Sequence, residues 1–470
     1  MFKNKNFKIT SFYLFGNIFD KAIIFLTIPI FTRLMSQNDY GIVNTYLSGV
    51  SILTVIVGLS LGSSIRSAYM DYKADIENYM TAIFQLSSFS FVIIFVVSIV
   101  FTKIFYSDAN IILVVLGLVH SYALFIVSCL NILYMMRVDY IKKTLLMTLL
   151  NVFITIFSII LLLLIDDNKY YSRIIPYVII YSLVGVFFYV KYINLWNKKS
   201  IKNYYKYALT ISVPLVFHGL STTVLFSADR IMLTWYRSAS ETAVYSLIYS
   251  LSMVTIVLKA SLESLWIPWF NDKISKNLTE EINNAVKKYI TAILSGMICL
   301  LLVSPEILHI MAPKEYWGGV NMIPIVISAS FFMFLYSISV NLEYYYKSTK
   351  MIATNTIIVA GLNIILNMIF IPKYGAIAAA FTTLVSYIIS FGVHYLMARK
   401  LDNRLFAFKL YIIPIIMMGS SVFIFYYLIE DILIRWIVAA GTFVWCILQL
   451  LGVNKLKQIK KSMNKSNEIK

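Results

Sequence analysis

Two adjacent pairs of opposite charge lie inside long apolar stretches of this sequence. Asp20 and Lys21 lie within FYLFGNIFDKAIIFLTIPIFTR at residues 12–33, and Asp229 and Arg230 lie within LFSADRIML. An ion in hydrocarbon costs from about 3 to more than 10 kcal/mol, so each is a candidate functional residue. Successive helix residues point about 100° apart, and neither pair can therefore neutralise itself within the dipeptide.

The residues of a third pair of opposite charge can neutralise each other within one helix. Lys259 and Glu263 stand four residues apart on one predicted helix and can pair with each other. Arg230 lies near the outer end of its helix and could snorkel towards water, whereas Asp20 lies about 12 Å from the nearer helix end at 1.5 Å per residue. We expect at least some of the six ions to line a hydrated central cavity.

Composition indicates the elements that position these ions. Of 470 residues, 60% are hydrophobic and 13% are charged, and mean hydropathy is +0.80, whereas a soluble domain is nearer one quarter charged. Apolar windows of about 20 residues recur along the chain, which predicts an all-α polytopic membrane protein with fourteen transmembrane helices. The predicted spans are 12–32, 41–62, 80–101, 110–134, 145–165, 174–195, 208–233, 243–267, 289–310, 321–341, 352–371, 375–397, 409–429 and 433–453.

The distribution of lysine and arginine predicts the orientation. Of the 40 basic residues, 29 fall on the side shared by both termini and 8 on the other, Arg173 and Arg435 among them. Basic residues concentrate in cytoplasmic loops, so both termini are predicted to be cytoplasmic. The net charge of +18 is then explained by orientation and anionic lipid rather than by nucleic acid. The three remaining basic residues are Lys21, Arg230 and Lys259.

The charged pairs also suggest a duplication. Helices 1 and 7 each carry an acid followed by a base, and each would begin a six-helix bundle of the same orientation. The two last helices stand outside this repeat. The predicted domains are residues 1–200 and 201–404 for the two bundles, 405–454 for the extra helices and 455–470 for a basic cytoplasmic tail.

Little in the sequence favours catalysis or a bound cofactor. The outer loops have roughly ten residues or fewer, too few for a folded outer domain. Three cysteines at no metal or redox spacing are expected to be packing residues, and the four histidines to be buried, hydrogen-bonded imidazoles. The tyrosines at 204, 205 and 207 are interpreted as interfacial aromatic residues. We therefore expect neither an enzyme nor a metal site.

Several motifs resemble those of one transporter family. A Gly-Asn pair near the start of helix 1, then IPIFTRLMSQNDYGIVN, DRIML, AVYSLIYS and IPWF, occur in this order. The chain thereby resembles the Wzx-type polysaccharide flippases of the multidrug/oligosaccharidyl-lipid/polysaccharide exporter (MOP) superfamily. The resemblance implies two six-helix bundles around a central cavity plus two C-terminal helices. It also implies translocation of undecaprenyl-diphosphate-linked oligosaccharide to the outer leaflet of a bacterial inner membrane.

Under this resemblance the embedded ions acquire roles. A diphosphate crossing a membrane needs fixed cationic partners, and ion-coupled alternating access by proton or sodium antiport needs carboxylates. The cations assigned to the substrate are Arg230, Lys259, Lys21 and Arg66. The carboxylates assigned to the coupling ion are Asp20, Asp229 and Glu263. For Arg66, interfacial snorkelling explains the position equally well.

Two questions stay open at this point. Three basic and three acidic residues are balanced, so either the carboxylates bind the coupling ion or some cations are already paired. A small-molecule or drug exporter of the same superfamily is the alternative function, with a site led by carboxylates. For the flippase, the expected pathway is O-antigen, capsule or exopolysaccharide synthesis, which the sequence does not distinguish, and the expected partners are membrane lipids, a polysaccharide polymerase and chain-length proteins.

Overall fold

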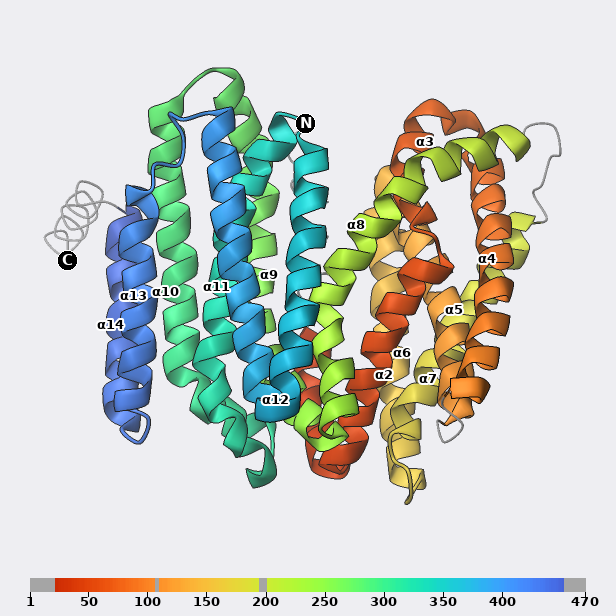
Figure 1. Cartoon of the computed structure of the whole chain (residues 1–470), viewed down its shortest axis with the longest axis horizontal. Coiled ribbons are helices and arrows are strands. Elements are labelled where there is room, and N and C mark those ends of the chain that lie inside the picture. The colour runs from red at the N-terminus through yellow and green to blue at the C-terminus, as the bar shows by residue number, and fades with distance from the viewer. Residues whose placement is uncertain (1–21, 106–109, 194–200, 452–470) are drawn as a thin grey trace, which may run out of the picture. The chain divides into compact units, whose positions relative to one another are not determined.

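Helices make up the regular structure of the described chain. The computed structural model describes residues 22–105, 110–193 and 201–451, and within these ranges every regular element is a helix (Figure 1). The prediction of an all-helical fold is confirmed. The predicted site residues Asp20 and Lys21 and the predicted tail 455–470 lie outside the described residues.

The chain divides into two compact units, Met1–Ser246 with Thr356–Ala379, and Leu247–Asn355 with Ala380–Lys470. The first contains the helix Ala22–Leu34, α2 (Gln37–Val57), η1 (Leu61–Ser64), α3 (Ile65–Asp71), η2 (Lys73–Asp75), α4 (Ile76–Phe105), α5 (Ile111–Met136), α6 (Tyr140–Leu164), α7 (Tyr171–Ile193) and α8 (Ile201–Tyr236). The second contains α10 (Thr279–Met311), η4 (Lys314–Met322), α11 (Ile323–Tyr345), α13 (Lys409–Tyr427) and α14 (Ile432–Leu451). Residues of α9 (Ala239–Ser275) and α12 (Thr349–Leu401) belong to both units. The domain limits expected at 200, 404 and 454 stay predictions.

The lengths and surfaces of the helices identify a multi-span membrane protein. In the described part of the chain, eleven helices are long and apolar enough to cross a membrane. On α4, for example, Tyr79 and Ile83 are fully buried while Phe89, Val92 and Val96 are exposed. Such an apolar outer surface belongs in lipid. The expected total of fourteen spans stays a prediction.

Two predicted spans, 352–371 and 375–397, are joined in α12. The helix breaks at Gly375, which has φ 60° and ψ −140°, a conformation that side chains disfavour. A Cβ atom there would lie 2.2 Å from Glu241 Oε2, so a larger residue would also have to displace that carboxylate. The same carboxylate accepts a hydrogen bond of 3.2 Å from the Ala376 N–H that the break exposes.

Close packing in the first unit brings α2, α8 and α9 together. α2 packs against α5 and α8, and α5 packs against α7 (Figure 1). At Gly41 an added Cβ atom would lie 1.7 Å from the carbonyl oxygen of Ala239, so the first turns of α2 and α9 meet backbone to backbone. α2 begins after Ser36, whose Oγ accepts from the Asp39 N–H at 3.0 Å.

The tyrosines at the start of α8 differ from their expected role. The Tyr204 hydroxyl donates to Asp75, that of Tyr207 donates to Asp71, and that of Tyr205 donates to the Gln85 side chain at 2.6 Å. Tyr204 is only 4% exposed. Its interpretation as an interfacial residue is wrong, because α8 begins at Ile201, seven residues before the predicted span, and Tyr204 lies on the face of the first turn that packs against the protein.

The second unit is assembled around α10, which packs against α11, α13 and α14 (Figure 1). Both α10 and α11 carry long runs of buried apolar side chains. The buried face of α10 therefore forms the centre of this unit, while α13 and α14 expose apolar side chains such as Ile413 and Ile437.

Candidate functional site

Asp229 on α8 is a buried carboxylate held by neutral hydrogen-bond donors. It is 1% exposed, and the Tyr245 hydroxyl donates to its Oδ2 at 2.6 Å. The Asn367 Nδ2 donates to its Oδ1 at 2.7 Å and also to Asn363 Oδ1 at 3.1 Å. Both asparagines are fully buried on α12, four residues apart and thus on one helix face. Neither of these donors carries a charge, so the two hydrogen bonds hold the carboxylate without themselves neutralising it.

Arg230, the neighbour of Asp229, has different contacts. It is half-buried, its Nη1 donates to the Phe226 carbonyl at 2.7 Å and its Nε donates to Ser246 Oγ at 3.2 Å. Its guanidinium carbon lies 5.8 Å from the ring centre of Tyr245, within cation–π range. Tyr245 therefore touches both charged groups, the acid through its hydroxyl and the base through its ring.

A chain of hydroxyl groups supports the backbone at Arg230. Thr45 Oγ1 on α2 lies 2.5 Å from Thr234 Oγ1 on α8, which lies 2.7 Å from Thr242 Oγ1 on α9. The Thr242 hydroxyl in turn lies 3.4 Å from the Arg230 carbonyl oxygen. Hydrogen bonds across three helices fix the part of α8 from which the side chains of Asp229 and Arg230 extend.

The predicted local pair on α9 is present. Lys259 Nζ lies 3.9 Å from Glu263 Oε1, and their side chains are 17% and 26% exposed. This supports the interpretation that some embedded cations are already paired. Lys259 and Glu263 belong to the second unit, whereas Asp229 and Arg230 belong to the first, so their meeting in one cavity stays a prediction.

The remaining predicted residues do not join this cluster in the described structure. Arg66 is exposed on α3, a short helix after the sharp turn at Leu59 and Ser60, as either of its two interpretations allows. Asp20 and Lys21 lie outside the described residues. The structure thus joins Asp229 and Arg230 directly through Tyr245.

Sequence analysis missed three members of the site, namely Tyr245, Asn363 and Asn367. All three are neutral, whereas the predicted site residues were identified by their formal charge within apolar spans. One signal was available: Asn363 and Asn367 stand at i and i+4 inside the predicted span 352–371. Two amides on one face of an apolar helix indicate a buried polar partner.

The count of three embedded basic residues omits at least two that the structure buries within helices, Arg173 on α7 and Arg435 on α14. Arg435 on α14 is 1% exposed and forms two contacts with Glu306 of α10, of 2.5 Å and 3.2 Å. Its Nη1 also donates to the Leu302 carbonyl at 2.7 Å. It was assigned to an outer loop because it stands near a helix end, where hydropathy does not reveal which way a side chain points.

Two of the four histidines follow the expectation and two do not. His394 is 2% exposed and its Nδ1 lies 2.9 Å from Glu343 Oε1, and His120 lies 3.3 Å from the Tyr46 hydroxyl. His309, by contrast, is exposed, with its ring centre 3.9 Å from that of Trp317, and His218 is half-buried with an Nδ1 that has no hydrogen-bond partner among the described residues. Among the described residues, no group of three or more His, Cys, Asp or Glu could hold a metal.

Comparison with known proteins identifies similar sequences. The sequence model of one family, described as "Polysaccharide biosynthesis protein", matches residues 7–274, more than half of the chain. An uncharacterized membrane protein of Methanocaldococcus jannaschii is 24% identical over 59% of this chain and 57% of that protein. A probable low-salt glycan biosynthesis flippase of Haloferax volcanii is 21% identical over 42% of this chain and 41% of that protein. The chain thus spans about half the length of the curated relatives it matches.

Solved structures share the fold. The lipid II flippase MurJ in an inward closed conformation is similar with a TM-score of 0.72 and 15% identity, covering 93% of this chain and 98% of that one. An inward-facing multidrug resistance MATE family transporter of the MOP superfamily gives 0.52 and 15%, covering 81% and 99%. A MOP superfamily transporter from Pyrococcus furiosus gives 0.51 and 13%, covering 84% and 95%.

Proposed function

The chain belongs to the polysaccharide biosynthesis protein family, and on that premise we propose that it is a flippase for lipid-linked oligosaccharide. The resemblance to Wzx-type flippases of the MOP superfamily is confirmed at the level of family and fold. Both point to a transporter rather than to an enzyme. The proposed substrate is an undecaprenyl-diphosphate-linked oligosaccharide repeat unit, moved from the cytoplasmic to the outer leaflet by ion-coupled alternating access.

The observation that carries this proposal is the division of contacts between Asp229 and Arg230. Asp229 is enclosed among Tyr245 and Asn367, and Arg230 is half-buried with its guanidinium over the Tyr245 ring. An enclosed carboxylate suits a proton or sodium ion, because either neutralises a charge that is expensive to keep in the membrane. A half-buried guanidinium suits a phosphate group, to which it offers several donors in a fixed fork.

The other assigned residues complete the mechanism. Lys259, Lys21 and Arg66 assist Arg230 with the diphosphate, while Asp20 and Glu263 share the coupling role with Asp229. Binding of the coupling ion at Asp229 changes the electrostatic field that Arg230 experiences through Tyr245, which both residues contact. Ion binding and substrate release are thereby coupled through groups that are already in contact.

The cellular setting follows from this function. The protein would lie in the inner membrane of a bacterium with both termini in the cytoplasm, and its membrane lipids would surround eleven or more spanning helices. It would supply repeat units to a polysaccharide polymerase and chain-length proteins in O-antigen, capsule or exopolysaccharide synthesis. The energy source would be a proton or sodium gradient, with no further cofactor.

A substitution series at Arg230 and Asp229 tests the proposal. We expect Arg230→Ala to abolish surface glycan and Arg230→Lys to retain part of it, as measured by glycan immunoblotting of cells lacking the native copy. Asp229→Asn should abolish glycan export while the protein stays folded, because the amide oxygen can accept from Asn367 and the amide NH2 can donate to the Tyr245 hydroxyl oxygen, but a neutral amide has no charge for a coupling ion to neutralise. Membrane abundance and the melting temperature of each purified variant serve as the folding controls.

The opposite result is equally specific. Normal surface glycan in a strain whose protein carries alanine at both 230 and 259 would end the assignment of a cationic diphosphate site. Intact glycan combined with drug hypersensitivity of the deletion strain would instead identify a small-molecule exporter.

A further inference from the structure

A polar groove lies in the second unit where α10 begins, α13 begins and α14 ends. One of its two cavities, of about 400 Å³, is lined by Thr279, Glu280, Asn283, Asn284 and Lys409, among others. The two cavities share Asn284 as a lining residue and are together called the α10 groove.

The second cavity carries most of the charge. It measures about 310 Å³ and is lined by Asn284, Lys287, Lys288, Thr291 and Gln449 together with Leu450. With Lys409, the groove thus presents three basic side chains. Its neutral members offer amide and hydroxyl donors.

The carboxylates near these lysines leave the groove positive. Glu280 is the one acidic residue that lines it. The neighbouring Glu281 is bound to Lys273 at 2.7 Å. Among the described residues no ion pair involves Lys287, Lys288 or Lys409, and all three are exposed. The groove therefore carries a net charge of two positive units for an anion of matching size.

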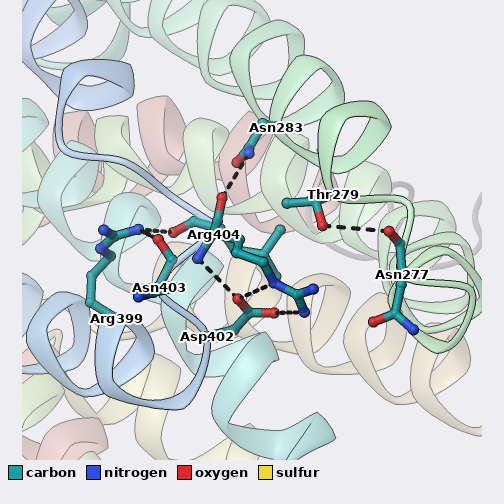
Figure 2. A network of polar contacts seen from close by, with 8 residues as sticks. Asn277, Thr279, Asn283, Arg399, Asp402, Asn403 and Arg404 are labelled. Atoms are coloured by element: carbon teal, nitrogen blue, oxygen red, sulfur yellow. Dashed lines mark hydrogen bonds and ion pairs between the residues drawn. The ribbon is translucent and has the colours of Figure 1, made fainter.

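The wall of the groove is fixed by hydrogen bonds rather than formed by loose side chains. Figure 2 shows that Asn283 reaches the segment between α12 and α13, where its Nδ2 donates to the Arg404 carbonyl at 3.1 Å. Its Oδ1 accepts from the Phe406 N–H at 3.0 Å. Asp402 holds the same segment by accepting from the Arg404 Nε and Nη2 at 3.0 and 2.9 Å (Figure 2).

Apolar surface continues from the groove along two of its helices. On α14, Val444, Ile447 and Leu448 are exposed within the five residues before Gln449. On α13, Ile412 and Ile413 are exposed about one turn after Lys409. A charged depression at helix ends, beside exposed apolar side chains of the same helices, has the polarity of a phospholipid, with a headgroup at one end and acyl chains at the other.

We propose that the α10 groove binds the headgroup of an anionic glycerophospholipid, with its phosphate between Lys287, Lys288 and Lys409 and its acyl chains along α13 and α14. Basic pockets between transmembrane helices on the cytoplasmic side hold such headgroups, and this face carries the lysine-rich connectors. Neither Asp229 nor Arg230 lines the groove, and the proposal does not depend on the flippase proposal.

Lipid titration of the purified protein tests this site. Delipidated full-length protein would be titrated with phosphatidylglycerol and, separately, phosphatidylcholine, with bound lipid counted by native mass spectrometry. We expect phosphatidylglycerol to bind more tightly, and K287Q/K288Q to weaken it about 30-fold, since each lysine at a membrane surface contributes about fivefold. The matched control is K347Q/K350Q, which removes two equally exposed lysines of the same unit outside the groove and should retain the affinity.

The contrary outcomes are distinct. Unchanged affinity in K287Q/K288Q, an equal loss in K347Q/K350Q, or equally tight phosphatidylcholine would each overturn the site. Competition by inorganic phosphate alone at similar concentration would show a soluble-anion site and likewise overturn the lipid assignment. K287R/K288R keeps the charge and should bind as the wild type does, which separates loss of charge from misfolding.

Discussion

Two regions of the molecule embed an acid and a base in apolar helices and use them differently. In the second unit, Glu306 and Arg435 face each other from α10 and α14 and share two contacts, so each neutralises the other. In the first unit, Asp229 and Arg230 are neighbours on α8 with largely separate partners, and the acid is held by Tyr245 and Asn367. A mutual ion pair fastens two helices, whereas the hydrogen bonds from Tyr245 and Asn367 hold the Asp229 carboxylate without themselves neutralising it.

Loss of one partner from the structural pair should have the largest effect on stability. We expect Glu306→Ala to lower the free energy of unfolding by about 3 kcal/mol, because it leaves the 1%-exposed Arg435 guanidinium without its carboxylate. Denaturant or thermal unfolding in detergent measures this. The double variant Glu306→Leu with Arg435→Met removes both charges and should recover most of the loss. A single variant as stable as the wild type would refute the view that this pair fastens α10 to α14.

The phenol in the first unit should contribute less to stability. Tyr245→Phe keeps the ring under Arg230 but removes the donor to Asp229, and we expect a loss of about 2 kcal/mol, as for hydrogen bonds to charged groups. The same unfolding assay measures it. If Asp229 is the coupling group, the variant should also show a shifted ion dependence of glycan export while Arg230-dependent binding persists. A stability loss as large as that of Glu306→Ala would contradict the view that the Asp229 contacts stabilise the fold less than the Glu306–Arg435 pair does.

The ion pair at the C-terminal end of α12 is expected to contribute least to the free energy of unfolding. Asp402 accepts hydrogen bonds from Arg404, and these lower the pKa of the Asp402 carboxyl. A lowered pKa in the folded state means that the pair stabilises above the ordinary aspartate range near 3.9 and that this contribution is lost as pH falls through the lowered pKa. Because the Arg404 side chain is 58% exposed, we expect less than about 1 kcal/mol.

The pH dependence can be isolated with one variant. Arg404→Gln removes the partner, so the difference in melting temperature between wild type and variant should be present at pH 7 and shrink as pH falls towards about 3. A difference that persists unchanged at pH 3 would show that Arg404 stabilises through packing alone.

Formal charge in an apolar window predicted part of the site. Asp229 and Arg230 could be found because ions are costly in membranes, and both lie in the same small cluster. Tyr245 and Asn367 could not be found in this way, because neutral polar side chains are common in spanning helices. Whether such a side chain binds a buried ion depends on which helices pack together, and the sequence does not show this. The positive φ of Gly375, which divides α12 where two spans were predicted, is likewise a tertiary fit to Glu241.

Helix-end residues mark the other limit of sequence reasoning. Arg435 is the fourth residue of α14, and a difference of one turn decides whether such a side chain reaches water or a neighbouring helix. Tyr204 shows the same ambiguity at the start of α8, where the helix extends beyond the apolar window and buries the ring. Fold class follows from average hydropathy, but the direction of a side chain at a boundary follows from packing.

The threonine chain where α2, α8 and α9 meet has fewer hydroxyl protons than hydrogen-bond contacts. Each of its three hydroxyls carries one proton. Five contacts each need such a proton: Thr45 with the Gly41 carbonyl, Thr45 with Thr234, Thr234 with Thr242, and Thr242 with the carbonyls of Ser238 and Arg230. Three protons cannot fill all five contacts at once, and the unfilled contacts can move along the row by rotation of hydroxyls while every heavy atom stays in place. The crossing is thus a single packing with several interchangeable proton arrangements.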